Sequence, residues 1–214
     1  ELVGPKTKGM TGSALTLTLM GAELALAKGL MDAGAYEKAI EGFSRSFNLA
    51  AENIERCVSW CGEHPEMAQA PHMIVVADGM ALPAALEGAL KVLETLYVPV
   101  FAYEFEEYLH GVNNTLNPQS WMIHLIPEGE NRGRFLALSD FAEEQGGHNF
   151  IISSGTPTTR AGELNLAASG NELTLPFEML LPFHAISALI SQIKGINCDK
   201  PQFKDFAQRL HTKA

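Results

Sequence analysis

The sequence predicts an α/β fold: a parallel sheet flanked by helices in a three-layer sandwich, with an N-terminal helical segment. From Pro71 onward, short apolar runs such as Met73–Ala77 and Trp121–Ile126 alternate with helical patterns. Near-continuous apolar runs are typical of parallel strands buried on both faces, and their alternation with helices is typical of helix-covered sheets. Before Pro71 the sequence carries two long helical patterns, which predict the N-terminal segment.

The individual elements follow from apolar spacing and from residues that begin or end helices. An apolar helix is expected over residues 7–31; its uncharged run at 10–22 is too short to span a bilayer, so we expect a buried bundle helix. An amphipathic helix is expected over 36–61. Strands are expected over 73–77, 98–103, 121–126 and 149–152, with a last edge strand over 172–176. Later helices are expected to begin at Pro83 and to cover 104–110, 131–145 and 181–193.

The composition is that of a soluble globular chain, with 214 residues of which 46% are apolar and 19% charged. A net charge of −10 argues against nucleic acid and against an anionic membrane surface as partners. Of the three cysteines, Cys57 and Cys61 lie at helical spacing. This usage fits a reducing cytoplasm, and we expect the pair to pack in the core.

No metal or cofactor is expected. The histidines His72, His124, His148 and His184 have no metal-ligand spacing. The two glycine-rich patterns that cradle nucleotide phosphates are also missing from the sequence.

Three charges stand on an otherwise apolar helical stretch. Glu87, Lys91 and Glu94 are spaced i, i+4, i+7, so they share one helix face. A helix apolar nearly all round belongs in a core, where a charge must be paired or must face a polar crevice. A carboxylate and an ammonium in a crevice suit proton transfer on a small polar substrate, whereas an ordinary surface pair is the alternative.

A second titratable group follows the next predicted strand. Glu107 lies three residues before His110, so the carboxylate is placed to orient the imidazole. Ligands of such sheets bind beyond the carboxyl ends of the strands, and we expect both sets of groups to converge on that edge. A helix-capping or core histidine is the alternative.

A third group lies at the start of the first helix. Lys6, Thr7 and Lys8 are placed where free N–H groups and the helix dipole favour an anion such as a phosphate. A solvated turn is the alternative reading of this segment.

Taken in order, four segments resemble one known family. Residues 6–11 are similar to its S-T-K-x-F-T segment, and residues 86–94 match its L-E-G-A-L-K-x-K-E helix almost letter for letter. Residues 107–111 are similar to E-L-K-H-G-P, and residues 193–201 to the tail I-K-G-x-x-x-D-x-P. The family is the isomerase half of glutamine–fructose-6-phosphate aminotransferase, built from two sugar isomerase (SIS) subdomains. Fructosamine-6-phosphate deglycases share the SIS architecture.

The resemblance implies roles for these residues. Glu94 would move a proton between C1 and C2 of a sugar 6-phosphate or amino-sugar 6-phosphate, and Lys91 would stabilise the oxyanion. His110 would assist ring opening and would reach a neighbouring subunit's site, which implies a homodimer. The remaining residues would bind substrate: Lys6, Thr7, Lys8, Glu87 and Glu107.

The resemblance also implies a domain division. Residues 1–70 would complete a first SIS subdomain that lies mostly before Glu1, residues 71–196 would form the second, and 197–214 the tail. What precedes Glu1 is left open, since a glutaminase domain, a DNA-binding domain or a bare SIS subdomain there would each select a different function.

Two departures from the family pattern bear on the reaction. Val112 stands where the family has proline, and the family's tail lysine falls at Phe206. We therefore place aldose–ketose isomerisation, or deglycation or deamination of an amino-sugar 6-phosphate, ahead of glutamine-dependent amination. A non-catalytic SIS module that binds sugar phosphates for regulation is the alternative from a different class.

Overall fold

A five-stranded parallel sheet forms the centre of the molecule, which is a computed structural model describing residues 5–200, 202–203 and 205–211. The strands lie in the order β2-β1-β3-β4-β5, and every neighbouring pair is parallel. Their bounds are β1 Met73–Ala77, β2 Val100–Glu104, β3 Trp121–Ile126, β4 His148–Ser154 and β5 Leu164–Leu166. The predicted parallel sheet is confirmed.

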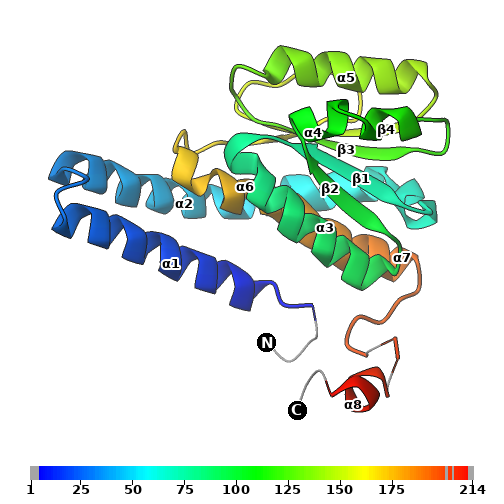
Figure 1. The fold of residues 1–214 in the computed structure, drawn as a ribbon, viewed down its shortest axis with the longest axis horizontal. Coiled ribbons are helices and arrows are strands. Elements are labelled where there is room, and N and C mark those ends of the chain that lie inside the picture. The colour runs from blue at the N-terminus through cyan, green and yellow to red at the C-terminus, as the bar shows by residue number, and fades with distance from the viewer. Residues whose placement is uncertain (1–4, 201, 204, 212–214) are drawn as a thin grey trace.

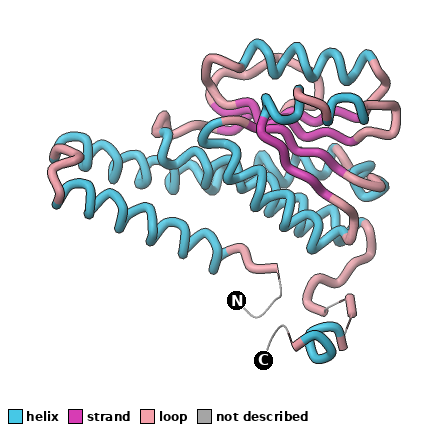
Figure 2. Tube along the Cα trace, viewed as in Figure 1, coloured by secondary structure: helices cyan, strands magenta, loops and turns pink. Residues whose placement is uncertain are grey.

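Helices cover both faces of this sheet (Figures 1 and 2). On β1, Val75 packs with residues of α2, α3 and α6, whereas its neighbour Val76 packs with residues of α4 and α5. Successive side chains of a strand point to opposite faces, so one apolar strand contributes side chains to the hydrophobic cores on both faces of the sheet. The helices are α1 Lys8–Ala27, α2 Ala33–Glu63, α3 Leu82–Leu96, α4 Phe105–Leu109, α5 Arg132–Glu144, α6 Leu175–Ala185, α7 Ser191–Ile193 and α8 Phe206–Leu210.

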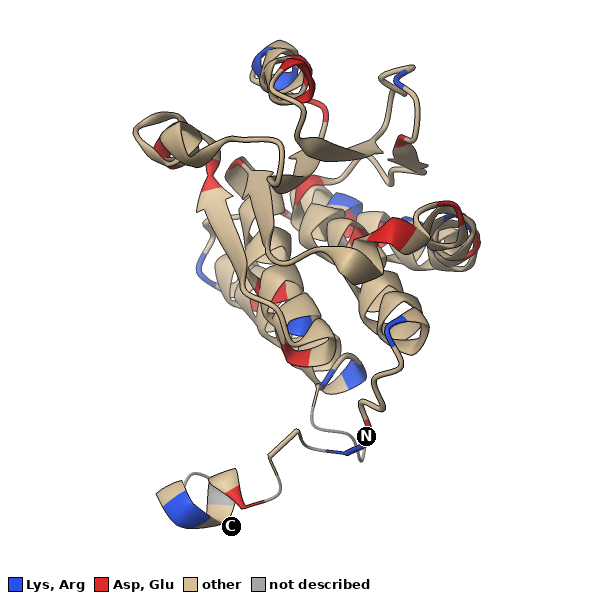
Figure 3. Cartoon of the chain, turned by 90° about the vertical axis from the view of Figure 1, so that its right-hand side faces the viewer, with Lys and Arg blue, Asp and Glu red and all other residues tan. Residues whose placement is uncertain are grey.

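The strands carry almost no charge, and the charged residues lie on helices and loops (Figure 3). Glu104, the last residue of β2, is the exception among the described strands, and its carboxylate accepts hydrogen bonds from the N–H groups of Glu106 and Glu107. This cap starts α4 directly at the strand end.

The predicted edge strand over residues 172–176 is wrong. Residues Glu172–Thr174 form a single helical turn that leads directly into α6. The Asn171 side chain accepts the N–H of Leu173, and Pro176 lies in the first turn of α6, where a missing N–H costs nothing. The edge strand is instead β5, and the helix predicted over 181–193 begins at Leu175.

The last helical stretch is irregular. Pro182 lies inside α6, and a π-helical turn, Ile186–Ile190, separates α6 from α7. Such turns are rare and frequently occur at functional sites. This one carries Ser187 along a pocket described below.

The expectation that the first helix is buried is also wrong. Within the described residues, Ala22 is the single buried residue of α1, and Leu17, Met20 and Leu24 are exposed. Figure 1 shows the reason, because α1 lies alongside α2 and away from the sheet. By length and composition, α1 and the segment Glu172–Ile193 could each cross a membrane, but a soluble protein's core helix passes the same test, and half of the second segment is buried.

Cys57 and Cys61 lie fully buried in the core that α2 forms with the sheet. Burial raises the pKa of each thiol to about 12, so both remain protonated and unreactive at neutral pH. Their expected role in core packing agrees with this position.

Candidate functional site

Three charged side chains of α3 form one ion cluster. The Lys91 Nζ lies 2.8 Å from Glu94 Oε2 and 3.4 Å from Glu87 Oε1. The helical spacing brings the three together, as the sequence predicts. The helix forms here because Pro83 begins it and alanine and leucine fill most of its length.

Lys91 is the buried member of the cluster, with 5% of its surface exposed. Burial alone would lower the Lys91 pKa, but the hydrogen bond and charge of Glu94, joined by Glu87, outweigh it and raise the pKa above its ordinary value. Lys91 is therefore an ammonium ion at neutral pH. The Glu94 side chain is 35% exposed, so this carboxylate remains accessible from outside.

Lys91 also lines a pocket of about 400 Å³. The pocket lies between α3, the π turn with α7, the tail after α7 and the segment before α1. Thr7 and Thr95 contribute to its wall together with Lys91. The complete lining is Pro5, Thr7, Lys91, Thr95, His184, Ser187, Ala188, Ser191, Gln192, Ile196, Asn197, Cys198 and Asp199.

Of the three predicted phosphate-binding residues, Thr7 is in this lining, whereas Lys6 and Lys8 are not among the described lining residues. Thr7 is the N-cap residue of α1, and its main-chain carbonyl accepts the Thr11 N–H at 3.0 Å. The start of α1 and Lys91 thus line the same pocket.

His110 lies at the end of α4, and both His110 and Glu107 are exposed. The neighbouring Glu106 forms an ion pair with Arg134 of α5. Arg134 lowers the pKa of Glu106 through this hydrogen bond. Among the residues that the structure describes, no hydrogen bond joins the His110 ring to Glu106 or Glu107, so the predicted orientation of the imidazole is not seen.

The expected convergence of Glu94 and His110 on one edge is wrong within a single chain. Because β1 and β2 are parallel, α3 runs back along the sheet and Glu94, near its end, lies where the strands begin. His110 follows α4, where β2 ends. The two helices also cover opposite faces, since α3 packs with Val75 and α4 packs with Val76.

A second pocket, of about 410 Å³, lies at the carboxyl ends of the strands. It spans the β1–β3 boundary, where the chain connections diverge in opposite directions and ligands of such sheets commonly bind. Its lining includes four carboxylates and, among the described residues, no lysine, arginine or histidine: Asp78, Glu128, Glu172 and Glu178. Asp78 follows β1 directly and Glu128 follows β3 after one residue, so their positions after apolar strands were the available sequence signal for this edge.

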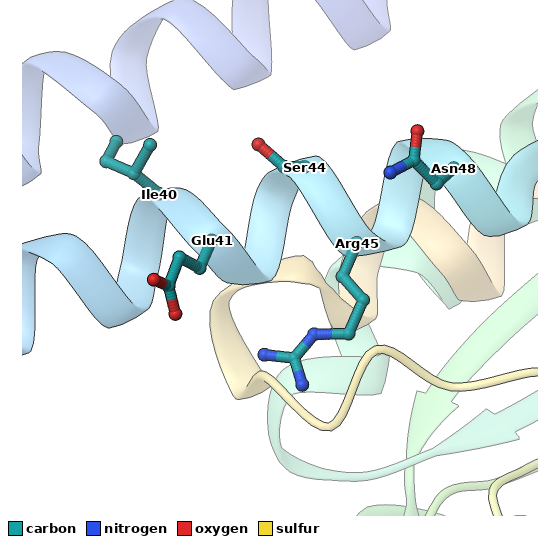
Figure 4. Close-up of a pocket in the computed structure, with 5 residues that line it drawn as sticks. All are labelled: Ile40, Glu41, Ser44, Arg45 and Asn48. Atoms are coloured by element: carbon teal, nitrogen blue, oxygen red, sulfur yellow. The ribbon is translucent and has the colours of Figure 1, made fainter.

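Two further observations concern the described residues outside these pockets. A shallow hollow of about 370 Å³ on α2, lined by Ile40, Glu41, Ser44, Arg45 and Asn48, contains none of the predicted site residues (Figure 4). Among the described residues, no three histidine, cysteine or carboxylate side chains are grouped to hold a metal ion.

Comparisons with known proteins agree with this architecture. Glutamine–fructose-6-phosphate aminotransferase [isomerizing] of Gluconobacter oxydans is 22% identical over 206 residues, which cover 94% of this chain and 34% of the relative. The chain thus spans about a third of the length of the curated relatives it matches.

Among solved structures, a candidate phosphosugar isomerase of Clostridium difficile 630 superposes with a TM-score of 0.91 at 26% identity, over 100% of this chain and 60% of that chain. The C-terminal domain of glucosamine-fructose-6-phosphate aminotransferase from Francisella tularensis superposes with a TM-score of 0.83 at 20% identity, over 92% and 57% of the two chains. The family model described as the SIS domain matches residues 66–192, more than half of the sequence. On this match, and on a helix-covered parallel sheet that superposes on these structures, the chain belongs to the SIS domain family.

Proposed function

We propose that this chain supplies catalytic residues to a phosphosugar-processing SIS enzyme. The substrate is a sugar 6-phosphate or an amino-sugar 6-phosphate, and the reaction moves a proton between C1 and C2 through an enediol or enolamine. One observation carries the proposal: the buried Lys91 ammonium lies 2.8 Å from the accessible carboxylate of Glu94 and lines a pocket. The names of the relatives, which act on hexose phosphates, support the substrate class.

In this proposal Glu94 is the general base and then the general acid. A partly exposed carboxylate can reach a substrate proton, and its partner Lys91 supplies positive charge where an oxyanion develops. Glu87 contacts the same ammonium at 3.4 Å, which fixes its position from the other side. Preorganised charge of this kind needs no rearrangement when the reaction begins.

His110 and Glu107 would act from a second copy of the chain. The sheet lies between Glu94 and His110, so one subunit does not bring them together. In a homodimer, a symmetric interface presents α4 of each copy to the other copy. His110 would then protonate the ring oxygen of the partner's substrate and open the ring.

The phosphate would be bound at the start of α1, where Lys6, Thr7 and Lys8 precede the first helical turn. Thr7 also lines the Lys91 pocket, so a phosphate bound at the start of α1 would lie beside the pocket that holds the reacting end of the substrate. Relatives are about three times as long as the matched region, so segments beyond this chain would add further phosphate ligands.

Among the reactions that share this enolisation, we favour isomerisation or the deglycation or deamination of an amino-sugar 6-phosphate, because Phe206 stands at the position of the family's tail lysine. Glutamine–fructose-6-phosphate aminotransferase (isomerizing) activity is the second candidate. The names of the curated relatives and the presence of Lys91 favour it.

Exchange of solvent deuterium into C1 and C2 of fructose 6-phosphate and glucosamine 6-phosphate tests the proposal. Glu94→Gln keeps the shape of the side chain and removes the base, so exchange should fall by about 10²–10⁴-fold while sugar-phosphate binding persists. Glu55→Gln, an exposed change on α2, is the matched control and should exchange at the normal rate. Undiminished exchange in Glu94→Gln would remove Glu94 from the mechanism, and binding without exchange by the unaltered protein would identify a regulatory module.

A further inference from the structure

The Lys91 pocket contains a serine that the proposed chemistry does not use. Ser187 lines the pocket from the π turn and has 6% of its surface exposed. Within the part of the chain that the structure describes, its Oγ makes no hydrogen bond. A buried hydroxyl without a partner is destabilising, and a ligand group that binds it would remove this cost.

Two other hydroxyls of the pocket, those of Thr95 and Ser191, have their protons engaged. Thr95 Oγ1 donates to the Lys91 carbonyl at 2.8 Å, and Ser191 Oγ donates to the Ala188 carbonyl at 3.3 Å. Each hydroxyl has a single proton, so towards a ligand both present lone pairs and act as acceptors. The pocket also contains the Asp199 carboxylate.

The hydrogen-bonding groups of the pocket indicate which kind of ligand group it binds. Acceptors from Thr95, Ser191 and Asp199 favour a group that donates hydrogen bonds, such as an amine or a hydroxyl. A phosphate is disfavoured, because the Lys91 ammonium already contacts two carboxylates and Asp199 adds negative charge. The pocket therefore suits a part of the substrate other than its phosphate.

We propose that this pocket is the subsite for the amino or hydroxyl substituent on the reacting carbons, and that Ser187 binds that substituent. The inference rests on the proposed function, because Lys91 links the pocket to Glu94 and so places its occupant beside C1 and C2. Rotation about the single χ1 bond turns the Ser187 hydroxyl into the pocket, where the substituent supplies a hydrogen-bond partner. The π turn determines which face of the helix carries Ser187, and so makes it part of the wall.

Calorimetric titration with two ligands that differ only at C2 tests this assignment: glucosamine 6-phosphate and 2-deoxyglucose 6-phosphate. Ser187→Ala should weaken glucosamine 6-phosphate binding about five- to tenfold, the value of one hydrogen bond, and leave 2-deoxyglucose 6-phosphate unchanged. The melting temperature should stay the same or rise, because the substitution removes an unpartnered buried hydroxyl. Ser46→Ala is the matched control, since Ser46 is also helical, has the same 6% exposure and lies on α2 outside the pocket.

The outcomes separate the subsite from the proposed function. Equal weakening of both ligands, or no weakening of either, would overturn the role of Ser187 while the proposed function stands. Failure of the unaltered protein to bind either ligand would overturn both. A change in melting temperature with unchanged discrimination between the ligands would identify Ser187 as purely structural and overturn the subsite.

Discussion

Phe183 of α6 lies directly against the backbone of α3 at Gly88. A Cβ atom at Gly88 would overlap the Phe183 ring, so only glycine fits between the two helices. Gly88 is the glycine of the L-E-G-A-L-K segment, and Phe183 is fully buried in the same core. The glycine thus sets how closely α6 approaches the helix that carries Glu87, Lys91 and Glu94.

Gly88→Ala should lower the free energy of unfolding by about 1–3 kcal/mol, because the added methyl group forces α3 and α6 apart in a filled core. Urea denaturation measures the change. Gly62→Ala is the matched control: Gly62 is in helix α2 with nothing within 4 Å of a Cβ atom, and alanine there should be neutral or stabilising. Equal stability of the two variants would contradict the close approach.

His124 should make the protein less stable in acid. Its ring is fully buried in β3, and burial lowers its pKa from 6.5 to about 4, against the opposing effect of the hydrogen bond that the ring Nε2 donates to Asn149 Oδ1. The unfolded chain therefore binds the proton more tightly than the folded one. His124 therefore contributes about 3 kcal/mol to the free energy of unfolding. This contribution is complete above pH 6.5 and is lost as the pH falls towards 4.

Urea denaturation at several pH values between 4 and 7 measures this loss. His124→Gln retains a partner for Asn149 and cannot titrate, so its stability should fall less steeply over this range. Parallel curves for the two proteins would show that other groups cause the acid sensitivity.

Lys91→Met should destabilise the fold by about 1–3 kcal/mol at pH 7, because it leaves Glu87 and Glu94 as neighbouring carboxylates without their ammonium. Neutralising both carboxylates as well, with Glu87→Gln and Glu94→Gln, should restore most of the loss. A single variant as stable as the unaltered protein at pH 7 would show that the cluster contributes nothing to stability.

Mixing two inactive variants tests whether the proposed site is shared between copies. Glu94→Gln and His110→Ala each lack one group, and hybrid dimers formed by subunit exchange would contain some sites with both groups intact. Deuterium exchange into the sugar phosphate should therefore recover in part. If both residues act from one subunit, no hybrid holds a complete site, and mixing would restore nothing.

The sheet and most helices could be predicted because their signals are local. The apolar run of β1 and the Pro83 start of α3 match the structure to within a residue. The edge strand was misassigned because β5 is only three residues long, whereas the polar–apolar alternation at residues 172–176 resembles a strand. Pro176, a typical first-turn residue, was the available signal for a helix.

The candidate site was predicted less completely. Spacing along α3 was enough to group Lys91 with Glu87 and Glu94, because neighbours in a helix are set by its period. Spacing along the chain could not place Glu94 against His110, since that depends on the direction in which α3 returns across the sheet. Ser187 carried no signal in the sequence, because a π turn and a pocket wall arise only from the packed structure.

The position of α1, away from the sheet, favours its local unfolding. Met10, in its first turn, packs against the core, and most of the remaining helix lies along α2 with Leu17 and Leu24 exposed. A helix that buries so little apolar surface separates from the rest at a small fraction of the global unfolding free energy. In hydrogen exchange, the amides of α1 should therefore lose protection long before those of β1 and β3, and the fold should behave as two cooperative units.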